Sequence, residues 1–583
     1  MSCRKLTLLS AVVLVIAGAI EGGLVTAQVQ FKDFKPVTDA LLQNPDPGDW
    51  INWRRTLDAW GYSPLKQVNK QNARQLQLAW SWGLGPGHIE MTPLVYNGVM
   101  YVVNPMSKDG AGGVQALDAV TGDLLWDYRH PLEAPPVFNG GNMRNLAIYG
   151  DKIFLATPDA HIVALNATTG KVAWDRTTAD YKLGYAYTSG PIVVKGKVVA
   201  GIRGCDHFKV TGMTDVCFIS ALDAETGREV WRTSTVAKPG EPGGETWGDL
   251  PLIYRAGGDA WIPGSYDPQT NLIYWATAQP KPWGRVSRRL DGDALYTNTV
   301  LALDPDAGKI VWYNQLVPGE SFDQDEVFEN ILIDYDGHSS LFKMGKLGIL
   351  WELDRKTGKF RSGYDLGYQT QVELNRLTGK VVYRPGILEK QASGQPVEFC
   401  PGFGGVKNWR AMAYSPESHA LYVPGTTVCQ RSAFSPVDQV ERGGGNSVRP
   451  YAGEETLATF PHPADPDHRG RFIAMDIKTG KILWEHPTKA GISSAVLTTA
   501  GGLAIVGDAD RNLYIHDAAS GRILYQTRLP TQVTGFPITY AVRSKQYIAV
   551  PVEARGETGG NAVFVFSLPD APVTGRSSRS ASR

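Results

Sequence analysis

The 583-residue chain has few cysteines and no excess of charge of either sign. Only five cysteines occur, and none lies in a Cys-x-x-Cys-His sequence, which excludes a covalently attached c-type haem. The ten histidines show no spacing typical of zinc sites. Lysine plus arginine and aspartate plus glutamate both number 58. The formal net charge is therefore zero, and we expect no overall attraction to nucleic acid or to an anionic membrane.

Long apolar runs are also missing, except near the N-terminus. Two basic residues precede the run Leu6–Ile20, and Val25–Ala27 offers small residues for cleavage. The alternative, a membrane anchor, needs a longer run, and Glu21 interrupts the end of this one. We therefore predict a secretory signal peptide over residues 1–27 and an exported protein with no membrane span.

The four cysteines beyond the signal are an even number in an exported chain. This predicts two disulfides. Their spacing favours local pairing, Cys205 with Cys217 and Cys400 with Cys429, although the sequence leaves the other connectivities open.

Turn-forming and aromatic residues are abundant, with 64 glycines, 37 prolines, 16 tryptophans and 24 tyrosines. One pattern recurs: VQALDAVTGDLLW, which ends at Trp126, reads as strand, tight turn and strand. Aspartate usually opens the turn, glycine supplies the positive φ, and an aromatic residue ends the second strand. Further copies end at Trp174, Trp231, Trp312, Phe360, Trp484 and Tyr525.

Such a repeated β unit is typical of a propeller or a β-solenoid. We expect each terminal aromatic residue to pack between neighbouring units. The strand Asn561–Pro569 is expected to close the ring with strands near Leu76–Trp82. The Ser/Arg-rich residues 571–583 are predicted to be disordered.

The stretch Gly257–Trp283 predicts a β-hairpin, with apolar runs Trp261–Ile262 and Leu272–Ala276 around a Pro/Asp/Asn turn. It resembles the cofactor-stacking hairpin of the quinoprotein alcohol dehydrogenases, which use pyrroloquinoline quinone (PQQ). The segment Gly48–Trp80 also resembles that family, and the similarity covers essentially the whole mature chain. The resemblance implies an all-β, eight-bladed β-propeller over residues 28–570.

The resemblance also assigns cofactor contacts. Trp261 stands where the family has the indole beneath the quinone, and Arg144 matches an arginine that pairs with a quinone carboxylate. Lys346 matches a basic residue that hydrogen-bonds the reactive quinone oxygens. The full implied cofactor-binding set is Glu90, Arg144, Thr188, Arg203, Gly204, Trp261, Lys346 and Asn408.

Four residues match metal positions of the family. Asp206 replaces the usual glutamate and Gln279 the usual asparagine, opposite changes in length that can compensate across one cation. Asp323 matches the general base, and Asp325 matches an extra carboxylate of lanthanide-using members. Because alternate residues of an extended segment project to the same side, both can face one ion, Ca²⁺ or a lanthanide. The alternative is an acidic, solvated surface turn.

Two departures from the family concern the substrate pocket. The stretch Val137–Gly141 lacks the adjacent cysteines that usually cover the quinone, and Ile492 takes the place of a pocket tryptophan. Both changes predict a roomier pocket. We therefore expect larger primary or secondary alcohols as substrates, with cyclic alcohols among the candidates.

The resemblance implies a periplasmic PQQ-dependent alcohol dehydrogenase. Asp323 would accept the hydroxyl proton, hydride would pass to the quinone beside the cation and Lys346, and electrons would leave to a separate cytochrome c. One alternative is a non-enzymatic propeller scaffold of the cell envelope, because some members of the superfamily bind no cofactor. A second is a PQQ enzyme that acts on sugars or aldehydes.

Overall fold

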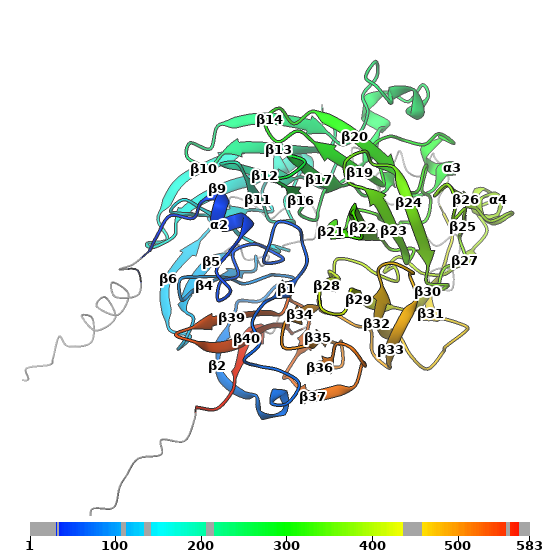
Figure 1. Cartoon of the computed structure of the whole chain (residues 1–583). Coiled ribbons are helices and arrows are strands. Elements are labelled where there is room, and N and C mark those ends of the chain that lie inside the picture. The colour runs from blue at the N-terminus through cyan, green and yellow to red at the C-terminus, as the bar shows by residue number, and fades with distance from the viewer. Residues whose placement is uncertain are drawn as a thin grey trace, which may run out of the picture.

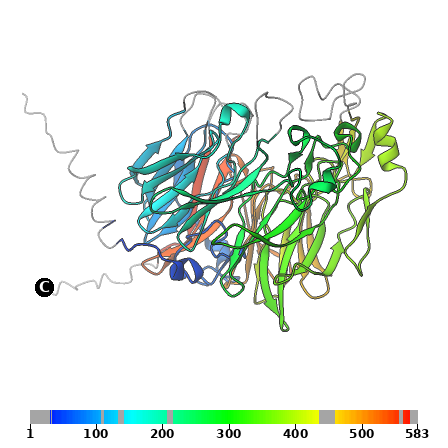
Figure 2. The ribbon, with the colours of Figure 1, turned by 90° about the horizontal axis from the view of Figure 1, so that it is seen from above.

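The computed structural model describes residues 31, 34–106, 112–132, 142–205, 215–434, 458–554 and 560–570, and its regular structure is almost entirely β. Within these residues the strands form eight sheets of four or five strands and three smaller sheets. The larger sheets lie side by side around a common centre (Figure 1). The α-helices of this part are short: α2 (Asp39–Gln43), α3 (Arg285–Arg288) and α4 (Ile387–Ala392). Figure 2 shows α4 on the opposite face of the sheets from α2.

The first four large sheets follow one another in sequence. The first contains β3 (Leu94–Tyr96), β4 (Val99–Asn104), β5 (Gly113–Asp118) and β6 (Leu124–Arg129). The second contains β7 (Ala147–Tyr149), β8 (Lys152–Ala156), β9 (His161–Asn166) and β10 (Val172–Thr177). The third contains β11 (Ile192–Val194), β12 (Lys197–Gly201), β13 (Phe218–Asp223) and β14 (Glu229–Ser234). The fourth contains β16 (Ser265–Asp267), β17 (Leu272–Ala276), β19 (Thr299–Leu303) and β20 (Ile310–Gln315).

The next sheets repeat this order. The fifth contains β21 (Ile331–Tyr335), β22 (His338–Met344), β23 (Ile349–Asp354) and β24 (Phe360–Asp365). The sixth contains β28 (Ala413–Ser415), β29 (Ala420–Thr426), β32 (Gly470–Asp476) and β33 (Ile482–Thr488). The seventh contains β1 (Tyr62–Ser63), β34 (Leu497–Thr499), β35 (Leu503–Gly507), β36 (Asn512–Asp517) and β37 (Ile523–Arg528).

The eighth sheet joins the two ends of the chain. It contains β2 (Gln77–Gly83), β38 (Gln532–Val533), β39 (Ile538–Val542), β40 (Lys545–Glu553) and β41 (Ala562–Ser567). The strands β2 and β41 are antiparallel, with Gln77 opposite Ser567 and Gly83 opposite Ala562. The predicted closure by the C-terminal strand is therefore confirmed.

Three smaller sheets lie in long connections. They are β15 (Ala256–Gly257) with β18 (Pro280–Lys281), β25 (Val372–Leu374) with β26 (Val381–Tyr383), and β27 (Val397–Phe399) with β30 (Val428–Ser432) and β31 (Ala458–Pro461). Both predicted disulfides are also confirmed, since Cys205 is bonded to Cys217 and Cys400 to Cys429.

The repeated aromatic residue fastens each sheet to the next. The indole of Trp126 donates a hydrogen bond to Ala167 O at 3.0 Å, in the turn of the following repeat. Gly170 of that turn has φ 68°, and a Cβ there would lie only 2.6 Å from the Trp126 ring. Glycine is therefore required both for the backbone angle and for the close approach. The same pairing recurs for Trp174 with Gly227, Trp231 with Gly308 and Trp484 with Gly521.

The hairpin prediction for Gly257–Trp283 is partly wrong. The paired strands are β16 and β17, with Ser265 opposite Tyr274, so Trp261–Ile262 is not a hairpin strand. Trp261 lies instead between β15 and β16, in a segment that the short β15–β18 ladder closes. Strand β16 begins only at Ser265, later than the apolar pattern predicts. Trp261 therefore lies in the loop before this strand.

Within the described residues, none of the helices has both the length and the apolar character needed to cross a membrane.

Candidate active site

The order of strands within each sheet places the predicted site residues of the described chain at the same end of the sheets, near their inner edges. The first strand of a sheet is fully buried, as in β3, whereas the fourth alternates between exposed and half-buried residues, as in β6. The first strands therefore form the inner edge. In an antiparallel pair, the start of the first strand and the end of the second lie at the same end.

Every predicted site residue of the described chain occupies one of these two positions. Glu90, Arg144, Thr188, Trp261, Asp323, Asp325 and Asn408 precede the first strand of a sheet, and Arg203, Gly204, Gln279 and Lys346 follow the second.

Asp323, Asp325, Gln279 and Lys346 are in direct contact. The Lys346 ammonium lies 3.0 Å from Asp323 Oδ2 and 2.9 Å from Asp325 Oδ2, and it donates to Asp323 O at 2.8 Å. The Gln279 amide donates to Asp323 Oδ1 at 2.7 Å, and the Gln279 backbone N–H to Asp325 Oδ1 at 3.2 Å. Both carboxylates face one positive charge, although the segment is not extended at Asp323, where φ is 61°.

The surface-turn alternative for this segment is wrong. Glu320, Glu326 and Glu329 are fully buried, and Asp323 and Asp325 are only 7% and 4% exposed. An isolated buried carboxylate is energetically costly. Five acidic residues buried in one loop therefore indicate a site built to hold charge. Asp323 also has φ 61°, in the left-handed region that non-glycine residues seldom adopt and that is common at functional sites.

Burial dominates the electrostatics of the pair. It raises the pKa of Asp323 well above its usual value, Asp325 and Glu320 raise it further, and Lys346 opposes the shift. Burial alone would lower the pKa of Lys346, but the carboxylates of Asp323 and Asp325 outweigh it and raise that pKa. The lysine therefore stays cationic beside both acidic side chains, whose oxygen atoms are of the kind that a hard cation binds.

Trp261, Arg144, Glu90 and Thr188 form a second group. The Arg144 guanidinium lies 4.9 Å from the centre of the Trp261 ring, forms an ion pair with Glu90, and donates to Thr188 O at 2.9 Å. Trp261 and Phe328 form a T-shaped pair, with ring centres 5.4 Å apart and planes at 89°. One face of the indole thus carries a planar cation that can also pair with a ligand carboxylate.

The structure adds a residue that the sequence interpretation missed. Asp259 is 2% exposed, accepts a hydrogen bond from Gly204 N at 2.6 Å, and lies 3.0 Å from Lys281 Nζ. Although burial would raise the pKa of Asp259, Lys281 and Arg203 lower it, so it remains a carboxylate. No spacing pattern in the sequence marks Asp259, because its contacts with Lys281 and Gly204 join separate loops. Arg203 itself exchanges backbone hydrogen bonds with Ala186, at 2.9 and 3.0 Å.

Two predicted residues, Asn408 and Ile492, contact residues outside these groups. Two further features, Asp206 and the stretch Val137–Gly141, lie outside the described residues. Asn408 makes local hydrogen bonds, to Gly404 O at 3.1 Å and from Trp409 N at 2.8 Å. Ile492 is buried in a hydrophobic cluster with Phe472 and other core residues, and that cluster contains no predicted site residue. The expected effect of Ile492 on pocket width therefore has no support from its contacts.

Several buried polar atoms in the two groups fit a bound polar ligand. Thr188 Oγ1, Gln279 Oε1 and Arg144 Nε have no hydrogen-bond partner among the described residues. Buried polar atoms are normally paired, so a missing partner is expected to be a ligand, an ion or water. Amide and carboxylate oxygens near Asp323 are the donors that a hard cation such as Ca²⁺ or a lanthanide prefers.

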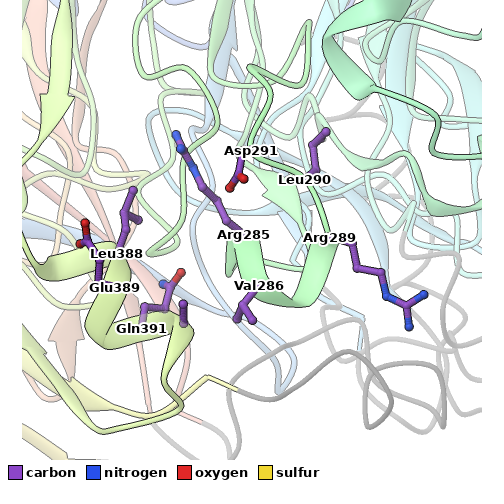
Figure 3. Close-up of a pocket in the computed structure, with 9 residues that line it drawn as sticks. Arg285, Val286, Arg289, Leu290, Asp291, Leu388, Glu389 and Gln391 are labelled. Carbon is purple, nitrogen blue, oxygen red and sulfur yellow. The ribbon is translucent and has the colours of Figure 1, made fainter.

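The segment that carries Asp323 is held from outside by α3 and the region around α4. Arg288 donates to Glu320 O at 2.8 Å, and Gln391 donates to Ser321 O at 2.7 Å. The two helices also form the walls of a surface pocket of about 350 Å³, with Arg285 and Leu388 on opposite sides (Figure 3). The geometry of the Asp323 loop thus depends on side chains from two inserted helices.

Comparison with known proteins gives a consistent result. Residues 50–360 and 368–548 match the family model described as "PQQ: Glucose/ethanol/alcohol dehydrogenase, beta-propeller domain". The quinoprotein alcohol dehydrogenase PedH of Pseudomonas putida (strain KT2440) is 32% identical over 93% of this chain and 91% of its own length. The lanthanide-dependent methanol dehydrogenase of Methylacidiphilum fumariolicum is 31% identical over 92% of this chain and 90% of its own. A solved europium-containing methanol dehydrogenase superposes with a TM-score of 0.78, at 27% identity over 91% of this chain and 100% of that one.

Proposed function

The chain belongs to the family of PQQ-dependent alcohol dehydrogenases, and from that premise we propose that it is a periplasmic enzyme that oxidises an alcohol to an aldehyde or ketone. Its cofactors are PQQ and one ion, Ca²⁺ or a lanthanide. The observation that carries the proposal is the contact of Asp323, Asp325, Gln279 and Lys346 at one buried point. A scaffold protein has no need to bury such a costly set of charges.

We further propose that residues 28–570 form one propeller whose eight large sheets are its blades. The side-by-side arrangement of the sheets and the β2–β41 closure support this (Figure 1). Residues 1–27 are proposed to be a signal peptide, which accounts for the periplasmic location.

The residues divide into those that hold the cofactor and those that act on the alcohol. Trp261 offers a flat surface, and Arg144, Arg203 and Thr188 offer donors to the carboxylates and carbonyls of PQQ. Gln279, Asp323 and Asp325, with Asp206, are proposed to hold the ion. When bound, PQQ supplies a two-electron oxidant that accepts a hydride, and the ion supplies Lewis acidity.

Asp323 is proposed to accept the hydroxyl proton of the alcohol at its carboxylate. The group must be ionised to do so. Burial raises its pKa and opposes ionisation, whereas Lys346 at 3.0 Å and the Gln279 amide at 2.7 Å favour the charged form. Burial at 7% exposure keeps water from competing for the proton. Positioning a base within hydrogen-bond reach of the proton is the main requirement for such a role.

The substrate is proposed to be a larger primary or secondary alcohol, cyclic ones included. The support is the stretch Val137–Gly141, which lacks the cysteine pair of the family. The reduced cofactor is proposed to pass electrons to a separate cytochrome c, because the chain has no haem-attachment sequence.

Reconstitution tests the proposed function directly. Purified protein is loaded with PQQ and either Ca²⁺ or La³⁺, and alcohol oxidation is followed with an artificial dye acceptor. We expect faster turnover of bulky alcohols than of methanol, because the missing cysteine pair in Val137–Gly141 predicts a roomier pocket. Faster turnover of methanol than of every bulky alcohol would contradict the substrate class. Failure to take up quinone would favour the scaffold, and turnover of sugars or aldehydes alone would favour the second alternative.

Replacement of Asp325 should change the choice of metal. We expect Asp325→Ala to weaken activation by La³⁺ at least about tenfold and activation by Ca²⁺ much less, because a trivalent ion gains more from each carboxylate. The measurement is activity against metal concentration for each ion. Asp510→Ala, at an exposed ion pair with Arg528, is the matched control. Equal losses with both ions would contradict a role in selectivity.

A further inference from the structure

We propose that His130, Asp159 and His161 form a second metal site, for a divalent transition-metal ion of the zinc type, separate from the site around Asp323. One ligand atom from each residue lies within 4.8 Å of the other two. His130 directly follows β6 of the first sheet, Asp159 lies between β8 and β9, and His161 is the first residue of β9. The site therefore bridges two neighbouring sheets.

The spacing of the ligand atoms suits such an ion. His130 Nε2 lies 2.9 Å from Asp159 Oδ2, and His161 Nε2 lies 4.0 Å from the same oxygen. Ligands about 2.0–2.1 Å from a tetrahedral zinc ion are separated from one another by roughly 3.3 Å. Small side-chain rotations are thus enough to bring all three atoms to one ion. A Thr177 hydroxyl 3.1 Å from His161 Nε2 must turn aside, which the surface position of that contact permits.

Each imidazole is oriented by a partner on its other nitrogen. His161 Nδ1 lies 2.7 Å from Asp175 Oδ1, and His130 Nδ1 lies 3.2 Å from the Tyr128 hydroxyl. The Asp175 carboxylate favours a proton on His161 Nδ1 and so a lone pair on Nε2. The Tyr128 hydroxyl can accept as well as donate, so it allows the same tautomer for His130 when a metal binds. Thr157 donates to the other oxygen of Asp159. Each of the three ligand side chains therefore has a second hydrogen-bond partner that orients it.

Charge and burial also favour a cation. Within the described residues, Asp159 lies within ion-pair distance of His130 and His161, and Asp175 of His161. Asp159 is only 5% exposed, and a buried carboxylate needs a cation or hydrogen-bond donors beside it. The side chain of His161 is 25% exposed, which gives an ion a route from solvent.

The donor set defines the class of ion. Two imidazoles and one carboxylate suit Zn²⁺, with Ni²⁺ and Cu²⁺ as competitors, whereas Ca²⁺ and lanthanides prefer oxygen alone. Three protein ligands leave the fourth position to water. An ion here would tie the first sheet to the second, and the site does not depend on the proposed oxidation of alcohols.

Metal titration of the full-length holoenzyme tests the proposal. Protein loaded with PQQ and Ca²⁺ is titrated with Zn²⁺ by calorimetry, and bound zinc is counted by elemental analysis. We expect one zinc per chain with X-ray absorption showing two imidazole ligands. His161→Gln should weaken binding by about 10–100-fold or more, and Asp175→Asn should weaken it less. His338→Ala, at a surface turn, is the control.

The alternative is a plain His–Asp hydrogen-bond network, with His130 Nε2–H donating to Asp159. It predicts no stoichiometric zinc in the wild-type protein, or zinc that His161→Gln retains, and either result overturns the proposal. Asp323→Asn tests whether the two sites are independent, because it should leave zinc binding at His130, Asp159 and His161 unchanged. Circular dichroism of each variant establishes that lost binding is not lost folding.

Discussion

Asp323→Asn is expected to lower kcat for alcohol oxidation by about 10²–10⁴-fold, the usual contribution of a positioned general base. The substitution keeps the size of the side chain and its contact with the Gln279 amide 2.7 Å away. It removes only the charge and the ability to accept a proton. Steady-state and single-turnover rates with PQQ, metal and a dye acceptor measure the effect.

Two further readouts separate loss of the base from loss of the site. Burial raises the pKa of Asp323, so activity should rise with pH as the group ionises, and the variant should lose that acidic limb. A bound cation moves the limb to lower pH. Uptake of PQQ, followed by its absorbance, should be retained, and Asp306→Asn at an exposed ion pair is the control. Retained turnover in Asp323→Asn would exclude this residue as the base.

The fold was largely predictable from the sequence because the aromatic residue of one repeat packs against the turn of the next repeat. Trp126 and Gly170 are far apart in sequence, yet the aromatic residue of one copy needs the glycine of the following copy to pack against. The interpretation failed where apolar composition was read as a strand. Trp261–Ile262 carries strand-type residues, but the β15–β18 ladder places them in the loop before β16.

The site was predictable only where its residues lie close together in the sequence. Asp323 and Asp325 lie two residues apart and contact the same lysine, but φ at Asp323 is 61°, so strand alternation is not the reason for their common direction. Asp259 meets Lys281 and Gly204 through contacts between separate loops, which spacing does not reveal. His130 and His161 likewise lack the spacing typical of a zinc motif, and the contact arises only because two neighbouring sheets place them together.

Lys407→Met is expected to destabilise the protein by about 3–5 kcal/mol, the usual cost of leaving one member of a buried ion pair alone. Lys407 and Glu329 are essentially unexposed and form an ion pair, and Glu329 also accepts a hydrogen bond from Met412 N at 2.9 Å. Lys407 lies 4.5 Å from the centre of the Phe328 ring, which in turn contacts Trp261. The ion pair therefore supports Trp261 of the candidate site, through Phe328, as well as the core.

A double substitution distinguishes an unpaired charge from lost packing. Lys407→Met with Glu329→Gln removes both charges and keeps an oxygen for Met412 N, so most of the stability should return. The free energy of unfolding is measured by denaturant titration, and no recovery in the double variant would contradict the unpaired-charge explanation.

The pH dependence of stability supplies a second measure of the same lysine. Burial lowers the pKa of Lys407 from 10.5 to about 8, although Glu329 opposes the shift. Between these values the unfolded chain binds more protons than the folded protein, so this group makes the free energy of unfolding rise with pH. Lys407→Met should show a smaller rise over that window than the wild-type protein. If Lys407→Met leaves the pH dependence of the free energy of unfolding unchanged, the pKa of Lys407 in the folded protein is normal. That result would contradict a lowering of the pKa by burial.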